Sequence, residues 1–411
     1  MATDSPATNR LKQFFLNPLF SGLLFLSSAV LYKVDGTDGS ITPLMVLASY
    51  LSLALLLISI FSRCVRKDWW IAGNISLTLA LLLSVEIGFY LLLGIPTREV
   101  KDFATEKPFG QSLESLVGFL PEPNVRIDPE TGHQIWSDYD ADYTVDNHYR
   151  RVTPNHQQQN QKHALFLGGS FTFGHGLEDD QTLPAIFQQV SEEYTAYNYG
   201  FNGFGTNNVL ARVQNQNLAD QIPEKQGVAF YIFIEDHMAR TIGTMDRYAK
   251  WVHSSPYYYL DGKTVIRDKD FKQGRPVLSW IYEHIYQLAI IQYLQIDFPA
   301  VMRARHYELV GSMIKEIETT YHSHFPDGNF FVVFYPSPVH PPSEEVSQLK
   351  PRLTDRNISY IDLKGAIDYN QRYRLEDGSH PNSEAHRILI HKLLSHITAE
   401  SESRNVSTAG Y

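Results

Sequence analysis

The run Leu165–Gly174, LFLGGSFTFG in one-letter code, decides both the fold and the site of this chain. Its apolar start predicts a buried strand, and the paired glycines predict a tight turn that presents the hydroxyl of Ser170. An isolated serine after a strand is more often a helix cap than a nucleophile. Far downstream, Asp377 and His380 lie three residues apart, just before a predicted helix. Together the three side chains supply a nucleophile, a general base and an acid that orients the base.

Strand-like and helical runs alternate from Ala164 onward. The predicted strands are Ala164–Leu167, Ala196–Asn198, Val228–Ile234, Phe330–Tyr335 and Ile358–Leu363, and the predicted helices are Leu183–Glu193, Asn207–Asn217, Arg303–Tyr321 and Glu384–Ile397. This alternation predicts a three-layer α/β/α domain, with helices on both faces of a parallel sheet. Ligands of such domains bind at the carboxyl ends of the strands. We therefore expect Ser170, Gly203, Glu235 and the 377–380 loop to lie at that edge.

Composition narrows the classes of function. The chain has 411 residues and a formal net charge of −10, which disfavours a nucleic-acid-binding surface. Its single cysteine, Cys64, excludes an intrachain disulfide. No Cys/His cluster has the spacing of a zinc site. We expect no metal, no organic cofactor and no nucleic-acid partner.

Three apolar runs near the N-terminus, Phe14–Tyr32, Thr42–Ser62 and Trp69–Gly94, are each long enough to span a bilayer. They predict a three-span anchor over residues 14–94 behind a cytoplasmic segment 1–13. A cleaved signal peptide is the competing interpretation of the first run. Basic residues between the second and third runs, Arg63, Arg66 and Lys67, place that loop in the cytoplasm. Everything after Gly94 is then extracytoplasmic, on a multi-pass protein of the plasma (inner) membrane.

Glu86 lies inside the third run, where a carboxyl group is costly. It either contacts another membrane subunit, handles a proton, or is hydrogen-bonded within the three-helix bundle, and we favour the last.

The rest of the chain divides by composition. Residues 95–160 predict a linker and pre-domain segment of loops and short strands, residues 161–398 the α/β domain, and residues 399–411 a frayed tail. Residues 240–300 interrupt the alternation with a hairpin that turns at Asp261-Gly262 and an aromatic amphipathic helix over Trp280–Leu294. This insertion either roofs the site, packs on the flank of the domain, or meets the membrane.

At this point the motifs resemble those of the SGNH/GDSL hydrolases. The run Leu167–Gly176 resembles the family's first block, Asn198–Asn207 its second, and Asp377–His380 its fifth, while Asp146–Arg150 resembles a segment that precedes the first block in membrane-tethered members. The resemblance covers roughly residues 145–398 and implies a flavodoxin-like domain. It also implies a Ser170, Asp377 and His380 triad, and an oxyanion hole formed by the backbone N–H groups of Ser170 and Gly203.

Two positions depart from the family pattern. Position 169 is Gly where the family usually has Asp, and Glu235 stands where the third block supplies an Asn amide to the oxyanion hole. A carboxylate cannot donate a hydrogen bond unless it is protonated. Either burial keeps Glu235 neutral, or Asn202 or Asn207 supplies the amide, or activity is weak or absent. We therefore name Glu235, Asn202 and Asn207 as candidate substrate-binding residues.

The resemblance implies a membrane-anchored serine esterase that acts on O-acyl esters of cell-surface glycans or lipids. Two alternatives stay open. One is an O-acyltransferase that takes its acyl group from a membrane-embedded donor protein. The other is a non-catalytic binding or assembly subunit that keeps the fold, and Glu235 favours it.

Overall fold

The computed structural model describes residues 43–66, 69–92, 124–127, 134–138, 141–154, 161–336 and 344–408. Two compact units divide the chain: residues 1–100 with 283–297 form the first, and residues 101–282 with 298–411 form the second. The predicted segment 1–13, the first predicted span and much of the 95–160 linker lie outside the described residues.

The first unit contains two long helices, α3 (Pro43–Arg66) and α4 (Trp70–Leu92), which pack together. They match the second and third predicted spans in position. Among the described residues, only Ile71–Leu91 is a helix long and apolar enough to cross a membrane; the apolar part of α3, Tyr50–Cys64, is shorter. The three-span anchor therefore stays a prediction.

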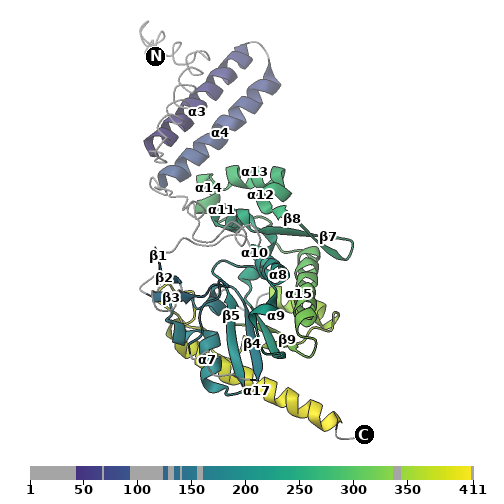
Figure 1. The fold of residues 1–411 in the computed structure, drawn as a ribbon. Helices are drawn as coiled ribbons and strands as arrows, with labels where there is room; N and C mark the ends of the chain where they lie inside the picture. The colour runs from purple at the N-terminus through teal and green to yellow at the C-terminus, as the bar shows by residue number, and fades with distance from the viewer. Residues whose placement is uncertain are drawn as a thin grey trace. The chain divides into compact units, whose positions relative to one another are not determined.

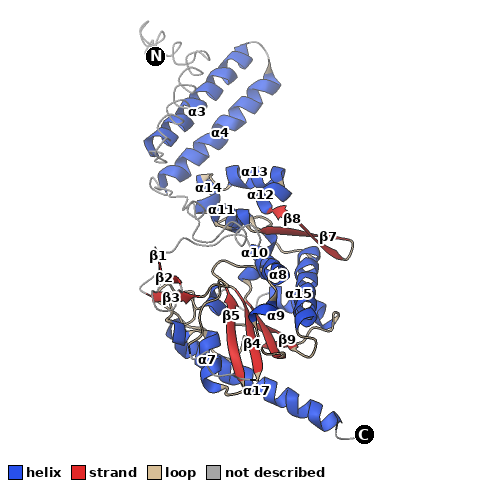
Figure 2. Cartoon of the chain, in the orientation of Figure 1, coloured by secondary structure: helices blue, strands red, loops and turns tan. Residues whose placement is uncertain are grey.

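The second unit is built on a five-stranded parallel sheet, which Figures 1 and 2 show flanked by helices. Its strands are β4 (Lys162–Gly168), β5 (Tyr194–Gly200), β6 (Gln226–Phe233), β9 (Asn329–Phe334) and β10 (Tyr360–Asp362). Their spatial order, β5-β4-β6-β9-β10, is the flavodoxin-like 2-1-3-4-5 when these strands are counted in chain order. The predicted parallel α/β sheet is confirmed.

Helices cover both faces of this sheet because its strands are apolar on both sides. Alternate residues of β4 enter separate cores. Leu165 and Leu167 pack in a core with α8 (Thr206–Asn215), α15 (Ala304–His324) and α16 (Glu344–Thr354), whereas Ala164 and Phe166 pack with α7 (Leu183–Val190) and α17 (Ser383–Thr408). The buried polar residues near the strand ends therefore lie on a rigid scaffold.

Besides the parallel sheet, the described residues form two smaller antiparallel sheets and several short helices. A three-stranded antiparallel sheet joins β1 (Asn124–Ile127), β2 (Gln134–Asp138) and β3 (Ala141–Val145). The expected hairpin at Asp261-Gly262 is confirmed as β7 (Pro256–Asp261) and β8 (Thr264–Asp270). The shorter helices are α6 (Ser170–Phe173), α9 (Leu218–Gln221), α10 (Asp236–Ile242), α11 (Met245–Lys250), α12 (Phe271–Gly274), α13 (Pro276–Ile285) and α14 (Ala289–Tyr293), with 3-10 turns η1 (Asp179–Gln181), η2 (Val252–Ser254) and η3 (Gln371–Tyr373).

One predicted helix was wrong, and the last helix runs further along the chain than expected. The single helix expected over Trp280–Leu294 is α13 and α14, separated by an extended Leu288. The helix breaks here because the N–H groups of Ala289 and Ile290 donate to the Glu86 carboxylate and not to carbonyls of a preceding helical turn. The tail expected to fray from residue 399 is helical to Thr408, since no Gly or Pro interrupts α17 before Gly410.

Candidate active site

The candidate nucleophile lies at the turn from β4 into α6. Ser170 is the first residue of α6 and is 4 % exposed. The residue before it, Gly169, has extended backbone and makes no side-chain cap. The hydroxyl therefore projects from the carboxyl end of a central strand, where the sequence predicted it.

The structure brings Asp377 and His380 to this hydroxyl. Nε2 of His380 lies 2.9 Å from Oγ of Ser170, and Nδ1 of the same ring contacts the Asp377 carboxylate. That carboxylate also accepts hydrogen bonds from the N–H groups of Ser379, at 2.8 Å, and His380, at 3.0 Å. Asp377 thus fixes both the backbone and the ring of His380.

Partial burial raises the pKa of the Asp377 carboxyl, but the hydrogen bonds from the His380 ring and the two backbone N–H groups outweigh it. The net pKa is well below the ordinary value. Asp377 is therefore ionised near neutral pH. It favours the tautomer of His380 in which Nδ1 carries the proton and Nε2 can accept one from Ser170.

The backbone N–H groups of Ser170 and Gly203 are the candidates for an oxyanion hole. Neither the Ser170 nor the Gly203 N–H donates to an acceptor within the described part of the chain. Gly203 has φ +76°, a conformation that favours glycine. Its carbonyl accepts a hydrogen bond of 3.3 Å from the indole of Trp251. This bond orients the peptide of the turn.

The three candidate substrate-binding residues lie in different environments. Glu235, 5 % exposed, is ion-paired with Lys364. Burial lowers the pKa of the Lys364 ammonium, because a charged group loses hydration there. The Glu235 carboxylate offsets part of that desolvation cost. A carboxylate that accepts from an ammonium does not serve as a protonated donor, so the pairing argues against a neutral Glu235.

Asn207 and Asn202 have different hydrogen-bond partners. The amide of Asn207 is fully buried and donates at 2.9 Å to the carbonyl of Pro256, in the insertion. Asn202 instead has its Nδ2 3.0 Å from Nδ1 of His175, whose ring centroid lies 4.5 Å from that of His380. Of the two, the structure connects Asn202 to the triad.

His175 was missed in the sequence, although it belongs to the first block. Burial, together with repulsion from Arg151 and from His380 whenever that ring is protonated, lowers the pKa of His175 to about 4 and outweighs the opposing attraction of Asp377. It is therefore a neutral imidazole at pH 7. Ligand atoms of His175, Asp377 and His380 all lie within 4.8 Å of one another, a spacing that a metal ion can bridge.

Arg151 is a second residue that the sequence did not reveal. Its side chain is fully buried and donates to the carbonyls of Phe173, at 3.1 Å, and Gly174, at 2.6 Å, while Nε binds Asp179 at 2.8 Å. It therefore fixes the turn that follows Ser170. Arg151 directly follows the Asp146–Arg150 segment, and that position in the sequence could have indicated a role near the site.

The space beside Gly169 is filled by α10. A Cβ at position 169 would lie 2.8 Å from Nε2 of His237 and 3.2 Å from Nη1 of Arg240. Arg240 donates at 3.0 Å to the carbonyl of Phe204, next to Gly203, and at 2.7 Å to Asp236. Burial opposes ionisation of Asp236, but Arg240 and Arg247 outweigh it and lower its pKa to about 2.

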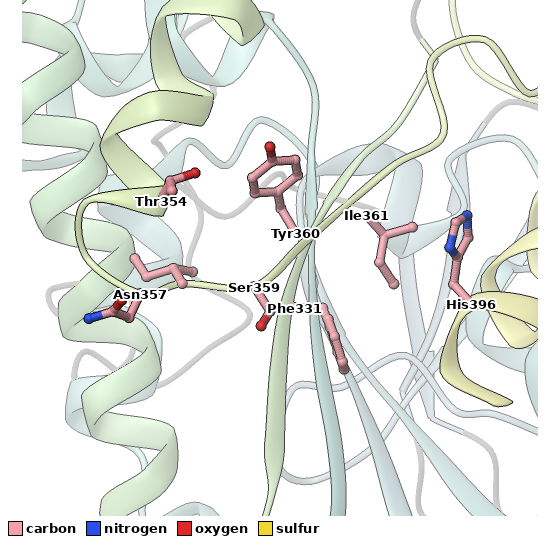
Figure 3. A pocket seen from close by; sticks show the side chains of 8 residues that line it. Phe331, Thr354, Asn357, Ser359, Tyr360, Ile361 and His396 are labelled. Carbon is pink, nitrogen blue, oxygen red and sulfur yellow. The ribbon is translucent and has the colours of Figure 1, made fainter. Parts of the chain in front are cut away.

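A separate hollow lies away from these residues. It is lined by Phe331, Thr354, Asn357, Ile358, Ser359, Tyr360, Ile361 and His396, seven of which are labelled in Figure 3. These residues surround the edge strand β10 and the end of α16, and Ser170, Gly203, Asp377 and His380 are not among them.

Comparison with known proteins gives similar structures but no similar sequence. No family model and no curated protein matches the chain. A lipolytic protein of the G-D-S-L family from Veillonella parvula is 13% identical, with a TM-score of 0.33 over 58% of this chain and 98% of that one. An acetyl xylan esterase from Butyrivibrio proteoclasticus is 8% identical, with a TM-score of 0.35 over 59% and 65%. A putative lipolytic protein of the same G-D-S-L family from Desulfitobacterium hafniense is 13% identical, with a TM-score of 0.31 over 57% and 99%.

Proposed function

We propose that this protein is a membrane-anchored serine esterase of the SGNH type, with Ser170, His380 and Asp377 as its catalytic triad. The observation that supports this most directly is the 2.9 Å approach of His380 Nε2 to Ser170 Oγ, since the two residues are 210 positions apart in the chain. The paired carboxylate of Asp377 supplies the third member of the hydrogen-bonded chain.

The mechanism follows from this geometry. Ser170 Oγ attacks the ester carbonyl while His380 Nε2 takes the hydroxyl proton. The Ser170 and Gly203 N–H groups stabilise the oxyanion of the tetrahedral intermediate. His380 then returns the proton to the leaving alcohol, and the acyl group remains on Ser170. Water, deprotonated by His380, hydrolyses the acyl-enzyme and regenerates the serine.

The substrate class rests on resemblance and on the predicted anchor. We propose O-acyl esters of cell-surface glycans or lipids, reached from the extracytoplasmic side. The candidate substrate-binding residues are Asn202, Glu235 and Asn207. Asn202 contacts His175 next to the proposed triad. Glu235 is already ion-paired with Lys364, and Asn207 already donates to the Pro256 carbonyl. Asn202 is the best placed of the three.

A fluorophosphonate probe tests the proposal directly. The full chain in detergent is expected to be labelled at Ser170, and Ser170→Ala to abolish both labelling and ester hydrolysis. Ser395→Ala is the matched control, because Ser395 is exposed on α17 and bonds only to a helix carbonyl. Turnover above about a tenth of wild type in Ser170→Ala would exclude the proposed nucleophile.

One observation favours a second candidate. The Glu235–Lys364 ion pair stands where the resemblance calls for an amide donor, which suits a non-catalytic binding or assembly subunit that keeps the fold. Absence of labelling in a folded protein would support that alternative. If labelling occurs, competition between water and a polyol acceptor for the acyl-enzyme separates an esterase from an O-acyltransferase fed by a membrane donor.

A further inference from the structure

One part of the insertion belongs to the membrane-helix unit and not to the catalytic unit. Residues 283–297, here called the docking segment, lie in the first unit together with α4. Its two ends return to the second unit, where Tyr282 donates at 3.1 Å to the carbonyl of Phe298 and that carbonyl also accepts from Met245 N. The docking segment is thus a loop whose two ends are hydrogen-bonded together in the second unit.

The docking segment is attached to α4 through Glu86. The carboxylate accepts hydrogen bonds from the N–H groups of Ala289 and Ile290, the latter at 3.1 Å. Three residues after Glu86 and four residues after Ala289, the rings of Phe89 and Tyr293 pack with centroids 5.0 Å apart. Glu86 and Ala289 are 6 % and 1 % exposed, so this contact is buried. Among the described residues, Glu86 is therefore satisfied by the docking segment.

The position of Glu86 sets the depth of the segment. Glu86 lies six residues before Leu92, the end of α4, which corresponds to about 9 Å of helix. If α4 spans the bilayer, this depth is the boundary between headgroups and acyl chains, where interfacial helices insert by about 5–10 Å. The N-terminal turn of α14 then lies at that boundary.

The composition of the region fits lipid. Between Pro276 and Val301 the chain has no Lys or Arg, and its only acidic residues are Glu283 and Asp297. Large apolar side chains nevertheless stay exposed in the docking segment: Tyr293 and Leu294 are 48 and 52 % exposed. An exposed Tyr beside an exposed aliphatic residue is typical of a membrane interface.

We propose that the docking segment inserts into the extracytoplasmic leaflet, with the acyl chains of the lipid as the occupant of its exposed apolar surface. The inference rests on the proposed anchor, since α4 sets the depth. Glu86 is then a docking residue. It joins the docking segment, whose two ends continue into the second unit, to the spanning helix by two backbone hydrogen bonds at membrane depth, where lost bonds are costly.

Depth-dependent quenching tests this in the full chain reconstituted in nanodiscs of zwitterionic lipid. A Cys64→Ala background removes the one native thiol. A fluorescent label is then placed by Leu294→Cys in the docking segment, by Leu81→Cys on exposed mid-α4, or by Lys263→Cys at the exposed hairpin tip. With brominated acyl chains, we expect loss of emission at 294 close to that at 81, and none at 263.

The outcomes separate the two claims. Quenching at 81 without quenching at 294 overturns the inference and leaves the anchor intact, whereas no quenching at 81 refutes the anchor itself. A shielded but unquenched label at 294 also overturns it, because a protein then covers the surface. Adding Glu86→Leu is expected to reduce quenching at 294 but not at 81; unchanged quenching at 294 would remove Glu86 from docking.

Discussion

The close approach of α10 to Gly169 makes a quantitative prediction. In Gly169→Ala the new Cβ would lie 2.8 Å from His237 Nε2, 3.2 Å from Arg240 Nη1 and 3.3 Å from the Phe204 carbonyl. The backbone of Gly169, φ −96° and ψ −150°, suits alanine, so the cost comes from contact alone.

The contact cannot relax freely. The His237 ring is buried, lies 3.1 Å from the Tyr231 hydroxyl through Nδ1, and stacks on the Tyr231 ring. Overpacking of this kind costs about 1–3 kcal/mol of unfolding free energy, or about 3–10 °C in Tm for a domain of this size. Displacement of Ser170 by a few tenths of an ångström is expected to slow fluorophosphonate labelling by about 10-fold.

Thermal unfolding and labelling rates measured in the same detergent check both effects. Gly365→Ala is the matched control, because a Cβ there meets no atom within 4 Å. The double change Gly169→Ala with His237→Ala should recover part of the lost stability, which a double-mutant cycle measures. If Gly169→Ala behaves like Gly365→Ala in both assays, the packing argument fails.

Three further predictions concern charge. Asp377→Asn should lower turnover by about 10³–10⁴-fold, since the amide no longer fixes the His380 tautomer; a loss smaller than ten-fold in steady-state kinetics would contradict the triad. Glu235→Asn should not raise activity, and should destabilise the fold by up to about 3 kcal/mol in denaturant titration because the half-buried Lys364 loses its partner; a gain in ester hydrolysis would show that the site lacks an amide donor. Burial lowers the pKa of His386 to about 3, below the ordinary 6.5, so the unfolded chain binds more protons and stability falls as pH drops from about 7 toward 3. His386→Leu should flatten the Tm profile across that range and exposed His391→Leu should not; equal profiles would refute this contribution.

Patterns of neighbouring residues in the sequence predicted the strands of the sheet and one hairpin turn correctly. The period and length of apolar runs predicted the five parallel strands, and Asp261-Gly262 predicted the hairpin turn. The order and spacing of the Ser170 and Asp377–His380 motifs predicted residues that the fold then brings within hydrogen-bond distance. Parallel topology accounts for this, because the ends of neighbouring strands meet at one edge of a sheet.

Long-range partners were not predictable from the same patterns. Glu86 and Ala289 are 203 residues apart, and no periodicity links an apolar helix to a distant insertion. Arg151 and His175 act through backbone carbonyls and ring contacts, which leave no residue pattern in a single sequence. The break at Leu288 likewise depends on a tertiary acceptor, so helix propensity alone extended one helix through it.

The two departures from the family pattern meet at α10. Gly169 leaves room for His237 and Arg240, and Arg240 binds the Phe204 carbonyl next to Gly203, the proposed oxyanion glycine. Asp236 in turn binds Arg240 and Arg247, so the turn that carries Gly203 is held by a charged network from the third-block helix. The turn that carries Gly203 consequently depends on α10 as a whole, and Gly169→Asp would place its side chain in the space that His237 and Arg240 occupy.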